Sequence, residues 1–154
     1  PFVGKLLVGE HEMPIKWTDE MTGELCKIRL DCLTEINGEL LIVDYKTAAD
    51  ASPDGFTRHA LKYGYDFQAG MYSKGVEATT GKKPRFVFVV QEKDPPYAVN
   101  VFDADEEFIQ HGKDKMRELL GIYHECKITN NWYGYMGADP VIAELSLPAW
   151  AAKE

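Results

Sequence analysis

The chain has 154 residues, of which 45% are hydrophobic and 27% are charged, a balance typical of one folded domain with a hydrophobic core. No stretch approaches the roughly 20 apolar residues that a membrane span needs, and the N-terminus lacks the basic and apolar segments of a signal peptide. The net charge of −8 argues against a broad basic surface, so a nucleic-acid enzyme of this composition must confine its positive charge to a groove or ring, or recruit metal ions.

The first part of the chain is predicted to form a β-hairpin. Residues 2–8 are an apolar, strand-like run without a starting cap, and this abrupt beginning suggests an N-terminally truncated fragment. Residues 4–17 mix β-branched residues with charges, residues 18–23 form a polar turn, and residues 25–33 alternate. In that alternation one face carries Leu25, Lys27, Arg29, Asp31 and Leu33, and the core face carries Cys26, Ile28, Leu30 and Cys32.

A third strand is predicted to bring charged residues to the edge of the core. Asn37-Gly38 is a signal for a tight turn. The apolar run 40–43 that follows is typical of a buried central strand, and it ends abruptly in Asp44-Tyr45-Lys46-Thr47.

The middle of the chain predicts a helix. Ser52-Pro53-Asp54 is a plausible helix start, and residues 56–76 have a helical pattern that an interruption near Gly64 could divide. One face of this helix is expected to carry Leu61, Tyr65, Gln68 and Tyr72.

The rest of the chain predicts two more strands and a second helix. Residues 85–91 and 97–102 have strand patterns, and Asp103 or Asp105 is expected to cap a helix that ends near Tyr123. The remainder is predicted to be irregular, with an apolar tail at 145–150 that could pack on a neighbour. The order of elements predicts an α/β fold in which helices flank a mixed central sheet.

The cysteines carry no sign of a metal site. Cys26, Cys32 and Cys126 are odd in number and lack close metal-ligand spacing. They are interpreted as reduced thiols of a cytoplasmic protein, with one disulfide pair as the alternative.

Asp31, Asp44 and Lys46 are the candidate catalytic residues. Asp44 and Lys46 point the same way because side chains alternate along a strand, and an antiparallel neighbour can bring Asp31 beside them. Two close carboxylates bind a hard cation such as Mg²⁺, the backbone carbonyl of Tyr45 could add an oxygen ligand, and a lysine beside the metal can orient the attacking water. The alternative is that Asp44 and Lys46 form a solvated surface pair worth about 0–1 kcal/mol.

Three segments of the chain resemble motifs of the PD-(D/E)XK nucleases of the RecB-like kind. They are Arg29-x-Asp31, Asp44-Tyr45-Lys46-Thr47 and the QxxxY motif from Gln68 to Tyr72. The hairpin of residues 14–33 is also similar to the RecE-like (exonuclease VIII) branch, which phages and prophages usually encode. The resemblance is close over roughly residues 10–75 and weak elsewhere.

The resemblance implies a PD-(D/E)XK (restriction-endonuclease-like) fold and a Mg²⁺-dependent exonuclease that degrades duplex DNA in the 5′→3′ direction during phage-type recombination or repair. Mn²⁺ is a possible substitute for Mg²⁺. The expected partners are duplex DNA, further copies in a homo-oligomeric ring and a single-strand annealing protein, in the cytoplasm of a bacterial host. In this reading Asp31 and Asp44 bind the metal, Lys46 is the catalytic lysine, and Gln68 and Tyr72 position the site or contact DNA.

The same reading divides a single nuclease domain, residues 1–154, into four parts. Residues 1–47 form a three-strand sheet with the acidic site, and residues 53–77 form the QxxxY helix. Residues 84–123 form a strand-strand-helix unit, and residues 124–154 form the irregular tail.

One expected feature of the family is missing from the sequence pattern. Family members have a further acidic residue or histidine on an N-terminal helix, whereas no helix is predicted here before the first strand. Glu10, His11 and Glu12 are the nearby candidates, but their context is strand-like.

Other side chains carry open alternatives. Lys27 and Arg29 are candidates for phosphate contact or for ion pairs with the acids, and Thr47 for a hydrogen bond near the site or a plain strand end. Arg58, His59 and Lys62 are candidates for the DNA path or for a solvated helix face. Gln68 and Tyr72 could instead serve only helix packing, and His111 and His124 are predicted to be surface residues without partners.

Five aromatic residues could stack on bases or, more simply, pack in the core or an interface. They are Tyr63, Tyr65, Trp132, Tyr133 and Tyr135.

Two other functions compete with the exonuclease. A nuclease with an iron–sulfur cluster needs four cysteines, three of them late in the chain, and here only Cys126 is late. The second is a catalytically impaired PD-(D/E)XK module that binds DNA or serves assembly, which the missing N-terminal ligand favours and the intact Asp31, Asp44 and Lys46 oppose.

Overall fold

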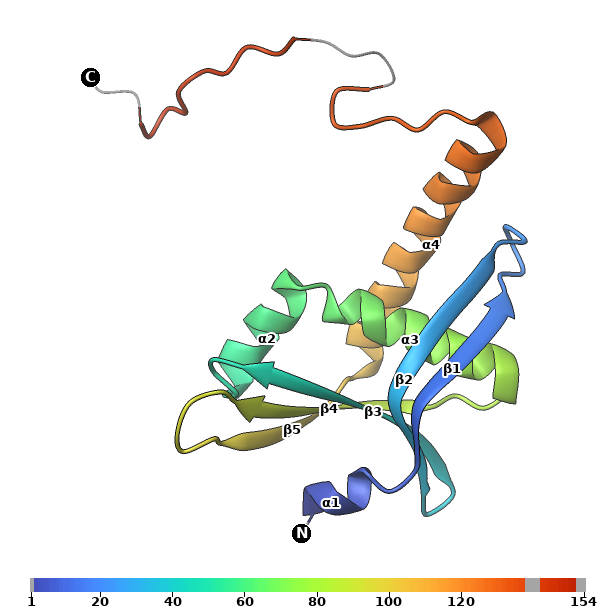
Figure 1. Ribbon diagram of the computed structural model, residues 1–154, viewed down its shortest axis with the longest axis vertical. Coiled ribbons are helices and arrows are strands. Elements are labelled where there is room, and N and C mark those ends of the chain that lie inside the picture. The colour runs from blue at the N-terminus through green and yellow to red at the C-terminus, as the bar shows by residue number, and fades with distance from the viewer. Residues whose placement is uncertain (1, 138–141, 152–154) are drawn as a thin grey trace.

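The computed structural model describes residues 2–137 and 142–151, and its strands and helices form one sheet with helices around it, followed by an irregular C-terminal segment (Figure 1). In chain order the elements are α1 (Phe2–Leu6), β1 (Glu10–Thr18), β2 (Leu25–Ile36), β3 (Glu39–Ala48), α2 (Pro53–Lys62), α3 (Tyr65–Thr80), β4 (Arg85–Glu92), β5 (Val99–Asp103) and α4 (Glu106–Thr129).

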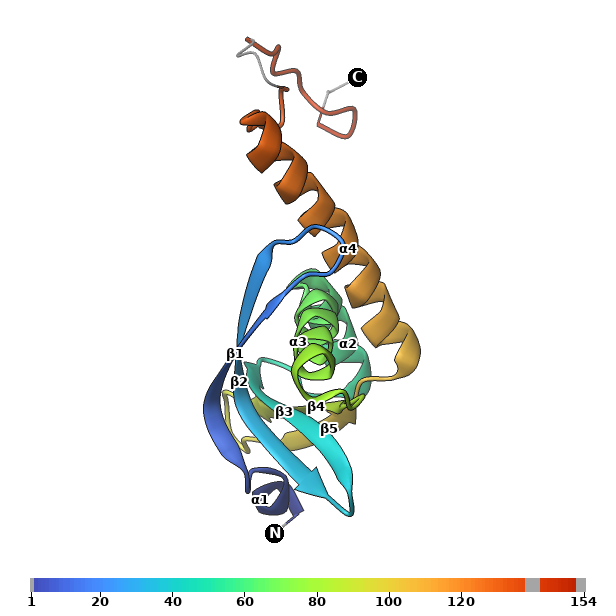
Figure 2. The same cartoon turned by 90° about the vertical axis from the view of Figure 1, so that its right-hand side faces the viewer.

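The sheet is mixed, as the sequence predicts. Its strand order is β1-β2-β3-β4-β5, and only β3 and β4 pair in parallel. A parallel pair needs a long crossover, and α2 and α3 supply it between these two strands. Figure 2 shows α3 between the sheet and α4, and α1 at the opposite end from the free end of α4.

The core lies on both faces of the sheet. On the face under α2 and α3, Ile42, Phe86 and Phe88 belong to the larger apolar cluster. On the other face, Val43 and Val89 pack against Leu6 of α1 in a smaller cluster. Alternate residues of β3 and β4 therefore serve two cores, which explains why both strands are almost continuously apolar.

The predicted face assignment of β2 is wrong at one point. Leu30 belongs to the cluster under the helices, whereas Cys32 belongs to the cluster around α1. The pairing of β1 with β2 passes from His11↔Cys32 to Met13↔Leu30, and Glu12 between them has a φ of 52°. The change of face therefore falls at Asp31, opposite the residue of β1 whose backbone leaves the extended region.

The N-terminal run is also different from the prediction. Residues Phe2–Leu6 form the short helix α1 instead of a strand, so a helix does precede the first strand. Val3, Leu6 and Leu7 lie at helical spacing and pack into the smaller cluster. A short apolar run is compatible with helix and strand alike, and here burial against the sheet decides the outcome.

Glycine divides the predicted central helix. Ser52 caps α2, its side chain accepting the backbone N–H of Gly55, and Gly64 in the left-handed conformation separates α2 from α3. The predicted interruption is therefore confirmed, but the predicted common face is not, because Leu61 is an exposed residue of α2 while the other three residues lie on α3.

Two glycines let α3 and α4 pack closely. A Cβ atom at Gly70 would lie 2.4 Å from the backbone of Gly112, and one at Gly112 would lie 1.8 Å from the carbonyl oxygen of Asp66. Only glycine fits at such a crossing. Asp105 caps α4 by accepting the N–H of Phe108, and the helix continues to Thr129, beyond the predicted end.

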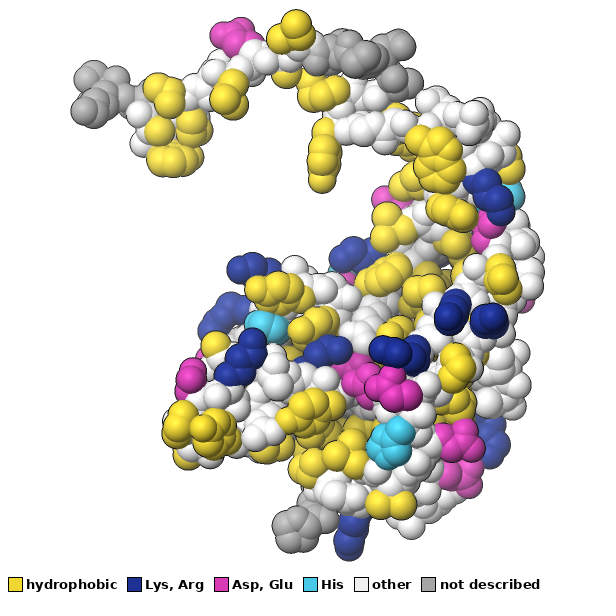
Figure 3. Space-filling view, in the orientation of Figure 1, with side chains coloured by type: hydrophobic (Ala, Val, Ile, Leu, Met, Phe, Trp, Pro, Cys, Tyr) yellow, Lys and Arg dark blue, Asp and Glu magenta, His cyan; other side chains and the backbone are white. Residues whose placement is uncertain are grey.

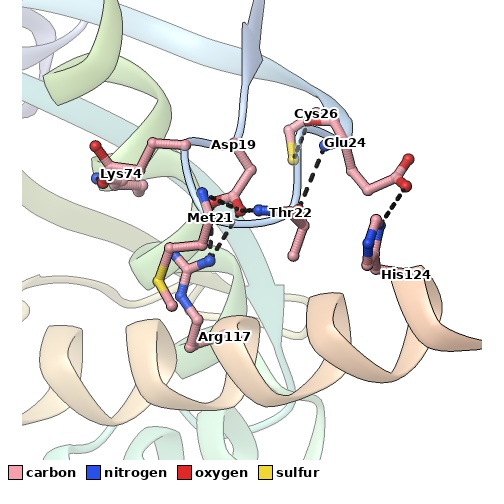
Figure 4. A network of polar contacts seen from close by, with 9 residues as sticks. Asp19, Met21, Thr22, Glu24, Cys26, Lys74, Arg117 and His124 are labelled. Carbon is pink, nitrogen blue, oxygen red and sulfur yellow. Dashed lines mark hydrogen bonds and ion pairs between the residues drawn. The ribbon is translucent and has the colours of Figure 1, made fainter.

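Ion pairs connect the β1–β2 hairpin to α4 (Figure 4). Arg117 donates to both oxygens of the buried Asp19, and Glu24 pairs with His124 and Lys127. His124 and His111, predicted to lack partners, are thus both paired, since His111 Nδ1 lies 2.7 Å from Asp66 Oδ2. Their partners are far away in sequence, which no local pattern reveals.

All three cysteines are free, as predicted, and all three are buried. Within the described residues, even the longest helix lacks the apolar length that a membrane crossing requires. The tail prediction at 145–150 falls on residues that the structure leaves exposed, with Leu145 99% accessible.

Candidate functional site

The candidate site lies where β3 leaves the core. Ile42 and Val43 are fully buried, and Asp44 follows them with only 1% of its surface exposed. Lys46 points the same way, as the strand period predicts, and its Nζ lies 2.5 Å from Asp44 Oδ2. The Lys46 side chain is 17% exposed, so this is not the solvated surface pair that the sequence left as an alternative.

Helix α3 contributes a second partner to Asp44. Gln68 Nε2 donates to Asp44 Oδ1 at 2.6 Å. Asp44 Oδ2 lies against the Lys46 ammonium. One buried carboxylate oxygen is therefore bonded to an amide, and the other is compensated by the Lys46 ammonium.

Asp31 approaches from the neighbouring strand. The β2–β3 pairing ends at Cys32↔Val43, so Asp31 is the next residue along β2 and Asp44 the next along β3. Asp31 Oδ2 accepts the backbone N–H of Tyr45 at 3.0 Å, in the place where the ladder has stopped. This hydrogen bond holds the Asp31 carboxylate against β3 next to Asp44.

The two carboxylates influence each other electrostatically. Burial raises the pKa of Asp44 above its ordinary value, the Lys46 ammonium and the Gln68 amide oppose the rise, and the negative charge of Asp31 adds to it. A cation between the two acids would relieve both the burial and the repulsion.

Two tyrosines of α3 border this group. Burial raises the pKa of Tyr72, and the neighbouring Gln68 side chain opposes this rise. The Lys46 ammonium lies 4.7 Å from the centre of the Tyr65 ring. The sequence placed Tyr65 on the same helix face as Gln68 but offered it only for stacking on bases or for packing, and not as a neighbour of Lys46.

The remaining predicted residues lie around the site and not in it. Arg29 and Lys27 are exposed on β2. Arg29 Nε lies 2.9 Å from the carboxylate of Glu12, so Arg29 does form an ion pair, but with Glu12 and not with the acids of the site. Thr47 is exposed at the end of β3. Arg58 and Lys62 are exposed on α2. The Tyr45 side chain is exposed and donates to Gln91.

The donor set fits Mg²⁺ in part. Among residues 2–137 and 142–151, no three His, Cys, Asp or Glu side chains gather closely enough to hold a metal ion. Mg²⁺ keeps several waters and binds through as few as one or two carboxylates, so Asp31 and Asp44 are a suitable pair of ligands.

None of the three N-terminal candidates completes the metal site. Both ring nitrogens of His11 lie near backbone carbonyls, 3.0 Å from that of Leu7 and 3.2 Å from that of Asp31. Glu12 pairs with Arg29, and Glu10 is exposed at the start of β1.

Comparison with known proteins places this site in a known fold. No curated protein matches the chain. The structure named "Putative exonuclease" from Eubacterium rectale matches with a TM-score of 0.60 at 20% identity, over 81% of this chain and 47% of that one, which shows a shared fold. The structure of SSO0001 matches with a TM-score of 0.45 at 16% identity, over 75% of this chain and 55% of that one.

The chain thus spans about half the length of these two structures. Its five-stranded mixed sheet with flanking helices is a PD-(D/E)XK-like fold. A family model described as "PDDEXK-like domain of unknown function (DUF3799)" matches residues 1–140. Since that match covers most of its length, the chain belongs to this family of PDDEXK-like domains.

Proposed function

We propose that this chain is the catalytic domain of a Mg²⁺-dependent exonuclease that hydrolyses phosphodiester bonds of duplex DNA. Its family consists of PDDEXK-like domains, and the E. rectale neighbour carries the name of an exonuclease. The 5′→3′ direction, the role in phage-type recombination or repair, the ring of copies and the annealing partner are further parts of the proposal, supported by the sequence resemblance alone.

One observation carries the proposal: the buried carboxylate of Asp44 at the end of a core strand. Burying an ionised carboxylate is unfavourable unless charges and hydrogen bonds compensate it. Here Lys46 and Gln68 compensate it and Asp31 repels it, at a place that opens to solvent beside Tyr45 and Thr47. Such opposed charges at a sheet edge are typical of a catalytic site and unusual for a purely structural pair.

Each residue of the site has a separate role in the proposed reaction. Asp31, Asp44 and the Tyr45 carbonyl would hold Mg²⁺, which when bound polarises the phosphate and lowers the pKa of a coordinated water. Lys46 would orient that water and offset the negative charge that develops on the phosphate. Gln68 holds one oxygen of Asp44, and Tyr72 borders Gln68.

The DNA backbone would reach the site across α2. Figure 3 shows Lys and Arg side chains over this helix, beside the hollow between the body of the molecule and the C-terminal segment. Arg58 and Lys62 are exposed there, and Lys27, Arg29 and Thr47 would extend the contact on the strand side. A local basic strip of this kind is compatible with the net charge of −8.

The test is degradation of end-labelled linear duplex DNA, compared with closed circular DNA, in Mg²⁺, Mn²⁺ or EDTA. The proposal predicts that linear DNA is degraded with either metal, that circular DNA and EDTA samples are not, and that Lys46→Ala slows degradation roughly 100- to 1,000-fold. Wild-type protein that leaves linear DNA intact in both metals would refute it.

A catalytically impaired DNA-binding or assembly module is the second candidate. It is favoured by the absence, among the described residues, of a third metal-ligating side chain near Asp31 and Asp44. The same experiment separates the two, because an impaired module would shift linear DNA in a gel without degrading it.

A further inference from the structure

A series of aromatic rings leads from Lys46 to the surface. The Lys46 ammonium lies over the ring of Tyr65, whose centre is 5.7 Å from that of the His59 ring. The His59 ring is in turn 4.4 Å from the ring of Tyr63, and the rings of Tyr63 and Tyr65 are 6.3 Å apart. The cation of the candidate site and the solvent are thus connected through three neighbouring rings.

The outer end of this series is open. Tyr63 follows the last residue of α2 and is 59% exposed, and Lys62 Nζ lies 5.6 Å from the centre of its ring. His59 is half-buried. The inner end is anchored, since Tyr65 stacks on the buried Phe88 at 6.0 Å. An anchored base, an exposed aromatic ring and a flexible lysine whose ammonium lies over that ring are features of surfaces on which single-stranded nucleic acids stack their bases.

We infer that His59 and Tyr63 form a stacking platform for an unpaired base of the strand whose phosphate lies at Asp44 and Lys46. This inference rests on the proposed function and adds the form of its substrate: a DNA end on which the nucleotides at the site are single-stranded. Lys62 and Arg58 contact the phosphates on either side of the stacked base.

A base inside a duplex has both faces covered by its neighbours, so it can stack on Tyr63 only after it leaves the helix. A blunt end must therefore open before it can use the platform, at a cost of a few kcal/mol per flipped base. An end that already has a single-stranded tail binds without that cost.

The experiment measures binding by fluorescence anisotropy in EDTA, where no cleavage can occur. Three labelled DNAs are compared: a blunt duplex, the same duplex with a short single-stranded tail of deoxythymidines, and the same duplex with a tail of abasic nucleotides. The variants are Tyr63→Ala, Tyr63→Phe and, as a matched control, Tyr123→Ala. Tyr123 is also an exposed tyrosine packed against an aromatic ring, but it lies on α4 against Trp132.

The inference predicts that wild-type protein prefers the deoxythymidine tail, and that Tyr63→Ala weakens binding of this tail roughly 5- to 150-fold. Tyr63→Phe restores the preference because it keeps the ring, and Tyr123→Ala leaves it intact. The abasic tail should bind wild type and Tyr63→Ala equally. Thermal unfolding of each variant shows that it is folded.

Two results would overturn the inference. If Tyr63→Ala binds the deoxythymidine tail as wild type does, while wild type degrades linear DNA in Mg²⁺, the platform is refuted and the proposed nuclease stands. If wild type neither binds nor degrades any of the three DNAs, both fail together.

Discussion

The ionised carboxylate of Asp44, which the proposed chemistry needs, destabilises the fold. Its carboxylate is buried, so burial raises its pKa, and Lys46 only partly reverses the effect. A carboxylate with a raised pKa binds protons more readily in the folded than in the unfolded state. Its ionisation therefore destabilises the fold as the pH rises above its ordinary value of 3.8.

Asp44→Asn removes this ionisation and keeps the shape of the side chain. We expect the free energy of unfolding of the variant, relative to wild type, to increase as the pH rises from about 4 to about 7, because only wild type must ionise a buried group in that range. Urea unfolding at several pH values measures this difference. A difference that stays constant with pH would contradict the account.

Ionisation of Asp19, unlike that of Asp44, stabilises the fold. Asp19 acts through the contact between the β1–β2 hairpin and α4. Burial by itself raises the pKa of Asp19, but hydrogen bonds from Arg117 and Thr22 lower it to about 2. The stabilisation is therefore present above the ordinary value of 3.8 and is lost as the pH falls toward about 2.

Arg117→Gln should lower the free energy of unfolding by at most about 2 kcal/mol at neutral pH, because Arg117 shares with Thr22 the lowering of the Asp19 pKa to about 2. The difference between variant and wild type should shrink as the pH falls below about 3.8. Acid titration of the two proteins in urea gives the comparison. An Arg117→Gln effect that is equally large in acid would show that packing, and not charge, makes this contact.

The crossing of α3 and α4 gives a second prediction for these elements. Gly112→Ala places a Cβ atom on the carbonyl of Asp66, so the helices must separate, and we expect a loss of about 2 kcal/mol or more. Gly121→Ala is the matched control in the same helix, because no atom lies within 4 Å of its Cβ position. It should stabilise the protein by about 0.5–1 kcal/mol through helix propensity. Thermal unfolding of both variants distinguishes the two cases.

Local sequence signals predicted most elements correctly. Asn37-Gly38 marked the turn between β2 and β3, Gly64 marked the end of α2, and Asp105 marked the start of α4. Two of the failures have a common cause. The helix α1 and the change of face at Cys32 both depend on packing against the smaller core, which involves residues far apart in the sequence.

The parts of the site that lie close together in the sequence were predictable from it, and the parts that depend on distant segments were not. Asp44 and Lys46 follow from the two-residue period of a strand, whereas Gln68 lies 24 residues away and was found only through the resemblance. The position of Tyr65 under Lys46 needed the structure, since it depends on how α3 crosses the sheet. Glu12 is absent from the site because it pairs with Arg29, and this pairing likewise depends on strand register.

At the scale of the whole molecule, the folded body and the C-terminal segment differ in what they bury. The side chains of Leu145 and Leu147 are exposed, whereas Leu30 is completely buried. Replacing both tail leucines by serine should change the free energy of unfolding by less than about 0.5 kcal/mol each, and Leu30→Ala should cost about 2–5 kcal/mol. Urea unfolding measures both. A large loss from the tail variant would show that the tail packs on the body or on another copy.

The most direct test of the central claim compares two buried carboxylates. Asp44 and Asp66 are each 1% exposed, but only Asp44 lies beside Lys46 and Asp31. The rate of degradation of linear duplex DNA in Mg²⁺ should fall more than about 100-fold in Asp44→Asn, because even indirect partners of a metal ligand contribute 10- to 100-fold. Asp66→Asn should degrade DNA at close to the wild-type rate. Equal rates in Asp44→Asn and wild type would contradict the account.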